Sequence, residues 1–167
     1  MIEVRVEDLA FYSGSAIIRP ATATLGATTP LLRRLELAGG AALLEHLKVS
    51  EPLPVGSAVV TAAGALPVEL LVHAIVMSPT ERVTREGVRR AFRSALERAR
   101  DWQLAEVAVA PLGLGAGNLE LEVSAEVMAG ELVRHTRMAT FPKHVTLVAE
   151  TPDEASALEH AMARSAV

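Results

Sequence analysis

Three glycines at alternate positions mark the segment of this sequence best suited to ligand chemistry. The segment reads Pro-Leu-Gly-Leu-Gly-Ala-Gly-Asn over residues 111–118, between an apolar run that ends at Val109 and an amphipathic stretch that begins near Leu119. Glycine lets a backbone approach a ligand closely, and a helix after such a loop directs free N–H groups toward an anion. The pattern predicts a phosphate-binding loop, although a tight strand-to-helix turn with nothing bound fits it too.

Other patterns that carry chemistry are missing from the sequence. The glycine spacing is neither Gly-x-Gly-x-x-Gly nor followed by Gly-Lys-Ser/Thr, which excludes Rossmann and Walker fingerprints. Without cysteine there is no disulfide, thiolate metal site or thiol nucleophile, and the five histidines lack the spacing of paired metal ligands. Ser13 and Ser15 have no histidine nearby in the sequence. We therefore expect no metal and no cofactor, and the catalytic residues, if any, stay unknown.

Two further polar features have structural interpretations. His73 lies inside an apolar strand and is expected to be a hydrogen-bonded core histidine rather than a base. Seven arginines between residues 82 and 100 are interleaved with acidic residues, and the net charge of the chain is −4. Nucleic-acid binding depends on a basic surface with stacking aromatic residues. The arginines are therefore expected to form a solvated helix face, and nucleic acid is not an expected partner.

Length and composition predict a single domain over residues 1–167. Half of the residues are hydrophobic but only 3% are aromatic, so we expect a core of closely packed alanine, valine and leucine. No charge-free apolar stretch is long enough to span a membrane, and the first residues lack the basic start and apolar run of a signal peptide. The chain is expected to be soluble and cytoplasmic, with no membrane partner.

The elements that must position the glycine loop alternate between strand and helix. Strands are expected at residues 2–6, 15–18, 57–61, 68–77, 106–110 and 145–149. Helices are expected at residues 31–37, resuming at 41–49 after a break at Gly39 and Gly40, then at 84–102, behind the glycine loop, and after residue 151. Thr29 and Thr151 each precede a proline and are expected to cap helices. The alternation predicts a three-layer α/β/α fold with a mixed, mostly parallel central sheet, whose ligands bind beyond the carboxyl ends of the strands.

The order of these elements and several motifs resemble a macro domain, the module of the Appr-1-p processing family that binds ADP-ribose and related nucleotides. Residues 54–61 read Pro-Val-Gly-Ser-Ala-Val-Val-Thr, followed by Leu-Pro at 66–67 and Leu-Val-His-Ala-Ile at 71–75. This block is similar to the family's glycine, strand ending in Thr-Pro, Leu-Pro and strand reading Val-Ile-His-Ala-Val. Residues 111–119 resemble the second phosphate loop with one residue deleted, and Glu-Asp-Leu at 7–9 stands where the family has Gly-Asp-Ile. The resemblance covers nearly the whole chain.

The resemblance implies a set of ligand-binding residues. The Asp8 carboxylate would accept a hydrogen bond from the adenine amino group, although an ordinary turn acid also fits this position. Backbone N–H groups of the glycine loop would contact the diphosphate and the distal ribose. The candidate ligand-binding residues are Asp8, Leu9, Arg19, Thr22, Gly113, Gly115, Ala116, Gly117 and Asn118.

The sequence departs from the family at the first phosphate loop. The family's Asn-Ala-Ala-Asn, whose last amide binds the distal ribose, is replaced by Arg-Pro-Ala-Thr at residues 19–22, and the glycine triplet becomes Thr28, Thr29 and Pro30. Proline has no N–H to donate, and β-branched threonine resists the conformations that glycine adopts. This loop is therefore expected not to hold a diphosphate in the usual way. The aromatic residue that often stacks on adenine is also missing after the last strand.

Arg19, at the end of a core strand, has two interpretations. A guanidinium there is costly to desolvate unless it is paired, and its planar shape suits phosphate or carboxylate. It either restores the anion affinity that the first loop has lost, or forms an internal ion pair with an acid such as Asp8 or Glu36.

Three functions stay open on the sequence. The first is binding of ADP-ribose or a related phosphorylated nucleotide without efficient catalysis. The second is an ADP-ribosyl hydrolase or O-acetyl-ADP-ribose deacetylase, whose chemistry positions a water against the distal ribose with the asparagine and glycine loop that are replaced here. The third is a structural or homo-oligomerising domain without a ligand. The departures place hydrolysis second to binding.

Overall fold

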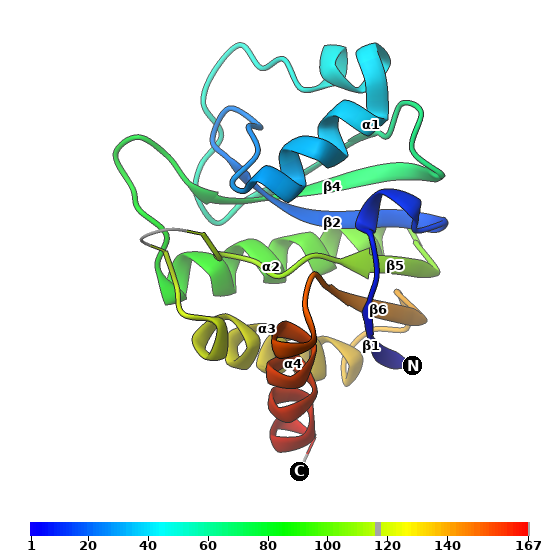
Figure 1. The fold of residues 1–167 in the computed structure, drawn as a ribbon, viewed down its shortest axis with the longest axis vertical. Helices are drawn as coiled ribbons and strands as arrows, with labels where there is room; N and C mark the ends of the chain where they lie inside the picture. Colours follow the sequence, from blue (N-terminus) through cyan, green and yellow to red (C-terminus); the bar gives the residue numbers. More distant parts are fainter. Residues whose placement is uncertain (116–117, 167) are drawn as a thin grey trace.

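The computed structural model describes residues 1–115 and 118–166, in which a six-stranded sheet forms the centre of the fold (Figure 1). The strands are β1 (Ile2–Val6), β2 (Gly14–Thr22), β3 (Ala58–Ala62), β4 (Val68–Met77), β5 (Glu106–Val109) and β6 (His144–Ala149). Their order in the sheet is β1-β6-β5-β2-β4-β3, and every neighbouring pair is parallel except β3 with β4. The predicted mixed, mostly parallel sheet is confirmed.

Helices cover both faces of the sheet. The helical elements are η1 (Leu9–Phe11), α1 (Pro30–His46), α2 (Arg85–Asp101), α3 (Leu121–Thr136) and α4 (Pro152–Ser165). Leu32, Leu35 and Leu43 of α1 pack on one face with Ile17 of β2, whereas α2, α3 and α4 pack on the opposite face with Ile18. This gives the predicted three layers. Within the described residues, no helix is long and apolar enough to cross a membrane.

Local sequence signals set the starts of α1 and α4. The Thr29 hydroxyl accepts a hydrogen bond from the Leu32 N–H at 3.3 Å, and the Thr151 hydroxyl accepts one from the Glu154 N–H at 3.2 Å. A proline occupies the first turn of each helix, where its missing N–H costs nothing. Both predicted caps are confirmed, and each places its helix start beside the carboxyl ends of the strands.

The predicted break in the first helix is confirmed at Gly40. Its φ of 75° and ψ of −171° are not helical, so α1 consists of two helical segments that meet at a kink, and the second segment ends at His46. The kink frees the carbonyl of Gly39, and this oxygen accepts a hydrogen bond from the Ala65 N–H at 2.9 Å. The helix therefore bends without leaving a buried carbonyl unpaired.

Strand β2 extends beyond its predicted end at residue 18. It continues through Arg19 and Pro20 to Thr22, in register with β4, whereas its pairing with β5 ends at Ile18. An arginine and a proline are unusual in a central strand, which is why the sequence pattern stopped earlier. The extension carries the Arg19 side chain into the interior, where it becomes part of the candidate site.

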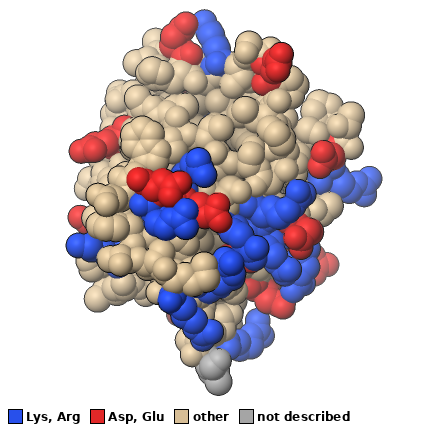
Figure 2. All heavy atoms as spheres, turned by 180° about the vertical axis from the view of Figure 1, so that it is seen from behind, with Lys and Arg blue, Asp and Glu red and all other residues tan. Residues whose placement is uncertain are grey.

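The arginine-rich helix α2 forms a solvated and charge-balanced face, as predicted. Figure 2 shows basic and acidic side chains gathered together on the back of the molecule. The arginines pair with acids in Arg85–Glu126, Arg89–Glu86, Arg93–Glu131 and Arg98–Asp101. Most arginines of this helix are therefore paired locally with acids.

Candidate ligand-binding site

Four connections meet at the carboxyl ends of the parallel strands. They are η1 after β1, the first loop (residues 23–29) after β2, the glycine loop (residues 111–118) after β5, and residues 150–151 after β6. A Cβ atom built on Gly115 would lie 3.5 Å from the carbonyl oxygen of Thr28 and 3.9 Å from Cγ2 of Thr29. Gly115 and the end of the first loop therefore lie close together at the edge of the sheet where α/β folds bind ligands.

A small cavity lies between the start of α1, the glycine loop and the residues that follow β6. Its volume is about 50 Å³, and its lining residues are Thr29, Leu31, Leu32, Ala110, Pro111, Leu114, Glu150 and Glu154. Pockets for ligands of drug size measure roughly 300–1,000 Å³. This cavity alone is smaller than a nucleotide, so it marks one part of the candidate site.

Backbone conformation explains two of the glycines in the glycine loop. Gly113 has a φ of 82° and Gly115 a φ of 132°, which L side chains rarely adopt. A Cβ on Gly113 would also lie 2.7 Å from Cγ2 of Val88, whereas Gly115 is exposed. Packing therefore requires a glycine at position 113, whereas the backbone of Gly115 is exposed to solvent. Ala116 and Gly117, also predicted as ligand-binding, lie outside the described residues.

The glycine loop leads into a helix start without a side-chain cap. Glu120 is the N-cap residue of α3, and its side chain makes no capping hydrogen bond within the described part of the chain. Asn118 instead fixes the loop, since its Nδ2 donates to the carbonyl oxygen of Leu114 at 3.3 Å and its N–H to that of Gly115 at 3.1 Å. The first turn of α3 therefore keeps N–H groups that can bind an anion.

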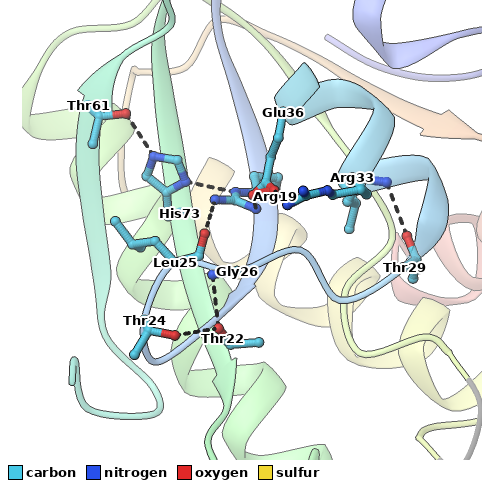
Figure 3. Close-up of polar contacts among 11 residues, drawn as sticks. Arg19, Thr22, Thr24, Leu25, Gly26, Thr29, Arg33, Glu36, Thr61 and His73 are labelled. Atoms are coloured by element: carbon cyan, nitrogen blue, oxygen red, sulfur yellow. Dashed lines mark hydrogen bonds and ion pairs between the residues drawn. The ribbon is translucent and has the colours of Figure 1, made fainter. Parts of the chain in front are cut away.

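The first loop is a tight turn held by its own residues (Figure 3). The Thr22 hydroxyl accepts a hydrogen bond from the Gly26 N–H at 2.9 Å, and the Thr22 N–H donates to the carbonyl oxygen of Gly26 at 3.0 Å. Leu25, between them, has a φ of 63°. Thr22, which occupies the position of the asparagine expected from the resemblance, thus uses its hydroxyl to shape the loop.

Arg19 lies fully buried beneath this loop and connects four elements (Figure 3). Its Nη1 lies 3.0 Å from Oε2 of Glu36 on α1, its Nη2 donates to the carbonyl oxygen of Leu25 at 2.9 Å, and its Nε donates to Nδ1 of His73 on β4 at 2.8 Å. Of the two interpretations of Arg19, the structure shows the internal ion pair, and the partner is Glu36 rather than Asp8. The guanidinium has no exposed surface, and it contacts the first loop through the hydrogen bond to the Leu25 carbonyl oxygen.

The Arg19 contact determines which nitrogen of His73 carries the proton. Arginine only donates, so Nδ1 of His73 is the acceptor and its Nε2 holds the hydrogen. Nε2 lies 2.8 Å from the hydroxyl of Thr61, which itself donates to the carbonyl oxygen of Ala62. The neutral imidazole therefore completes a directed chain of hydrogen bonds, which confirms the prediction of a core histidine.

Burial and charge shift the pKa values of both side chains. Burial lowers the pKa of the His73 imidazole well below its usual value of 6.5, and the adjacent positive charge of Arg19 lowers it further. Burial also lowers the pKa of the Arg19 guanidinium, an effect that the Glu36 carboxylate opposes. The network thus consists of a charged Arg19–Glu36 pair and a neutral His73.

Stability is expected to decrease as the pH falls below 6.5, because protons bind His73 in the unfolded chain before they bind it in the folded one. The contribution of His73 is complete above pH 6.5 and is lost below it, by at most about 1.4 kcal/mol per pH unit. Urea unfolding between pH 7.5 and 5.5 measures the slope. His73→Gln, which keeps a neutral acceptor and donor, is expected to flatten it, and an equal slope in that variant would contradict the assignment.

Asp8 and Leu9 lie at the far end of the same edge. Oδ1 of Asp8 accepts a hydrogen bond from the Ala10 N–H at 2.9 Å and caps η1, while the side chain is exposed. Among the described residues no donor contacts Oδ2 of Asp8. The Leu9 side chain is buried in the core on the α1 side, so a ligand could meet only its backbone.

Sequence reasoning missed two polar side chains at the cavity. Glu150 and Glu154 line it, and Oε1 of Glu154 accepts a hydrogen bond from the Glu150 N–H at 2.9 Å. The sequence patterns gave no sign of this cavity. In the first loop, the Thr28 hydroxyl is buried without a hydrogen-bond partner in the part of the chain that the structure describes.

The chain is similar to proteins from several lineages. The profile of the Macro domain family matches residues 29–128. An uncharacterized protein of Aeropyrum pernix is 30% identical over 152 residues, which cover 89% of this chain and 78% of that protein. A macro domain-containing protein of Methanosarcina mazei is 24% identical over 172 residues, covering 98% and 92%. An uncharacterized protein of Mycobacterium tuberculosis is 27% identical over 134 residues, but the match covers only 37% of its length.

Solved structures share the fold at low sequence identity. A variant of the Oceanobacillus iheyensis macrodomain with ADPR superposes with a TM-score of 0.87 at 17% identity, covering 98% of this chain and 92% of that one. The Trypanosoma brucei macrodomain in complex with ADP-ribose gives a TM-score of 0.85 at 16% identity, covering 95% and 68%. Since the family profile spans more than half of the sequence and the architecture agrees throughout, the chain belongs to the macro domain family.

Proposed function

We propose that this macro domain binds ADP-ribose, or a closely related phosphorylated nucleotide, between the first loop and the glycine loop, and that it hydrolyses ADP-ribosyl bonds inefficiently or not at all. The observation that carries the proposal is the closeness of Gly115 to Thr28 and Thr29, in a loop that leads into the uncapped start of α3. Backbone N–H groups on both sides of such a junction suit a diphosphate.

The first loop forms one side of the proposed site. It is held by the Thr22–Gly26 turn and by Arg19, whereas Gly115 on the other side is exposed. At the far end of the same edge of the sheet, Oδ2 of Asp8 would accept a hydrogen bond from the adenine amino group.

Weak catalysis follows from the chemistry of position 22. Hydrolysis at the distal ribose needs a polar group that orients the ribose and a water. Thr22 replaces the amide expected there, and its hydroxyl is already engaged with the Gly26 N–H. Binding without efficient turnover is therefore the better-supported function.

A ligand panel tests the proposal. Thermal unfolding and calorimetry with ADP-ribose, ADP, AMP, NAD and inorganic phosphate are expected to show stabilisation by ADP-ribose and ADP, of about 2.7 kcal/mol at a ligand concentration of roughly 100 times Kd. Release of ADP-ribose from a mono-ADP-ribosylated protein is expected to be slow. Absence of stabilisation by every ligand would leave a structural or oligomerising domain, and rapid release would identify a hydrolase.

A further inference from the structure

We propose that the free edge of strand β3 pairs antiparallel with the β3 edge of a second copy of this chain, so that the protein forms a two-fold symmetric dimer. The proposal does not depend on the ligand. It starts from the order of the sheet, in which β3 and β1 are the two outermost strands. An outermost strand presents a row of backbone N–H and C=O groups that no neighbouring strand pairs.

The pairing with β4 determines which backbone groups of β3 point outward. Opposite residues in an antiparallel pair alternate between hydrogen-bonded and non-hydrogen-bonded pairs. The Ile75 N–H donates to the carbonyl oxygen of Ser57 at 2.9 Å, so the alternation gives the hydrogen bonds with β4 to Val59 and Thr61. The residues whose backbone groups face away from β4 are Ala58, Val60 and Ala62. Within the described part of the chain, no hydrogen bond joins their N–H groups to a loop or a helix.

The two outermost strands differ in the protection of their edges. Charged side chains, proline and bulges are common devices that keep an edge from pairing with another chain. β1 carries Glu3 and Arg5, whose partly exposed side chains pair at 2.7 Å. β3 reads Ala-Val-Val-Thr-Ala, without charge or proline, and its register with β4 runs without a shift. The β3 edge is therefore the one suited to pairing with another strand.

The sequence of β3 fits a second copy of itself, because it reads nearly the same in both directions around Val60. A two-fold axis at this residue places Val60 opposite the partner's Val60, Ala58 opposite the partner's Ala62, and Val59 opposite the partner's Thr61. The outward N–H and C=O groups then meet in register, no like charges face each other, and the opposed valines and threonines are residues favoured in strands. Since each copy uses its one unprotected edge, assembly stops at the dimer.

Ala62→Pro tests the proposal. The residue is exposed, and proline removes an outward N–H rather than one that bonds to β4, so the monomer is expected to keep its fold. Analytical ultracentrifugation of the wild type is expected to show a monomer–dimer equilibrium as the concentration rises to about 1 mM. The dimer dissociation constant of Ala62→Pro is expected to be about 30-fold higher, because a hydrogen bond is lost on each side of the axis. Ala62→Ser, which keeps the N–H, is the matched control and is expected to associate like the wild type.

Amide hydrogen exchange of the wild type locates the interface independently of any variant. Pairing predicts that the amides of Ala58, Val60 and Ala62 gain protection as the dimer forms, whereas β4 protects those of Val59 and Thr61 in both states. A wild type that stays monomeric at about 1 mM would overturn the proposal. A dimer would also overturn it if the three outward amides gained no protection, or if a folded Ala62→Pro associated as strongly as Ala62→Ser. None of these results would bear on the binding of ADP-ribose.

Discussion

Gly115→Val is expected to weaken binding of ADP-ribose and ADP roughly 100-fold or more, with little loss of fold stability. The added Cβ would lie 3.2 Å from Nδ2 of Asn118 and 3.5 Å from the Thr28 carbonyl oxygen, and the two further methyl groups would fill the space between the loops. Valine also resists the φ of 132°. Loss of one or two hydrogen bonds to a charged ligand, each worth about 1.5–3 kcal/mol, accounts for the fold-change. Calorimetric titration measures it.

The control for this prediction is the same substitution at an open helical position. Gly130 lies on the exposed side of α3, and a Cβ there would meet no atom within 4 Å. Gly130→Val is expected to keep the affinity of the wild type. Wild-type affinity in Gly115→Val would instead place the ligand away from the glycine loop and remove the main support for the proposed site.

Arg19→Met is expected to destabilise the fold by about 3–5 kcal/mol, because it leaves the buried Glu36 carboxylate with only the exposed Arg33 at 3.6 Å. It also removes the donors to His73 and to the Leu25 carbonyl oxygen. At about 2–4 °C per kcal/mol for a chain of this size, the unfolding temperature would fall by roughly 10 °C. Differential scanning calorimetry measures the change.

A double variant separates the unpaired charge from the other lost contacts. Arg19→Met with Glu36→Leu removes both charges, and apolar replacement of a buried pair is often neutral or stabilising. Recovery is expected to be partial, since the Leu25 carbonyl oxygen stays without its donor. Arg33→Met, which breaks only an exposed pair, is expected to cost less than about 1 kcal/mol. An unfolding temperature of Arg19→Met within 1 °C of wild type would contradict the role of the network.

Local signals made most of the fold predictable. A threonine followed by a proline sets a helix start within a few residues, and the caps at Thr29 and Thr151 formed as expected. Apolar periodicity likewise indicated β4 and α2 nearly to their ends. These features depend on neighbours in the chain, which a sequence displays directly.

Features that depend on strand register and loop packing could not be predicted. The sequence indicated Glu36 as one possible ion-pair partner of Arg19. The hydrogen bonds from Arg19 to His73 and from His73 to Thr61 form only because β2, β4 and β3 lie side by side. The closeness of Gly115 to Thr28 joins segments about 90 residues apart. Residue types suggested a phosphate loop, whereas the position of that loop beside the first one is a tertiary property.

An NMR titration of the isotopically labelled protein with ADP-ribose tests the central claim most directly. The proposed site predicts that the largest amide shifts fall on Gly113, Gly115 and Asn118 of the glycine loop and on Thr28 and Thr29 of the first loop, and that they saturate together. Saturating shifts confined to another surface, such as the arginine face of α2, or no shifts at millimolar ADP-ribose, would contradict it.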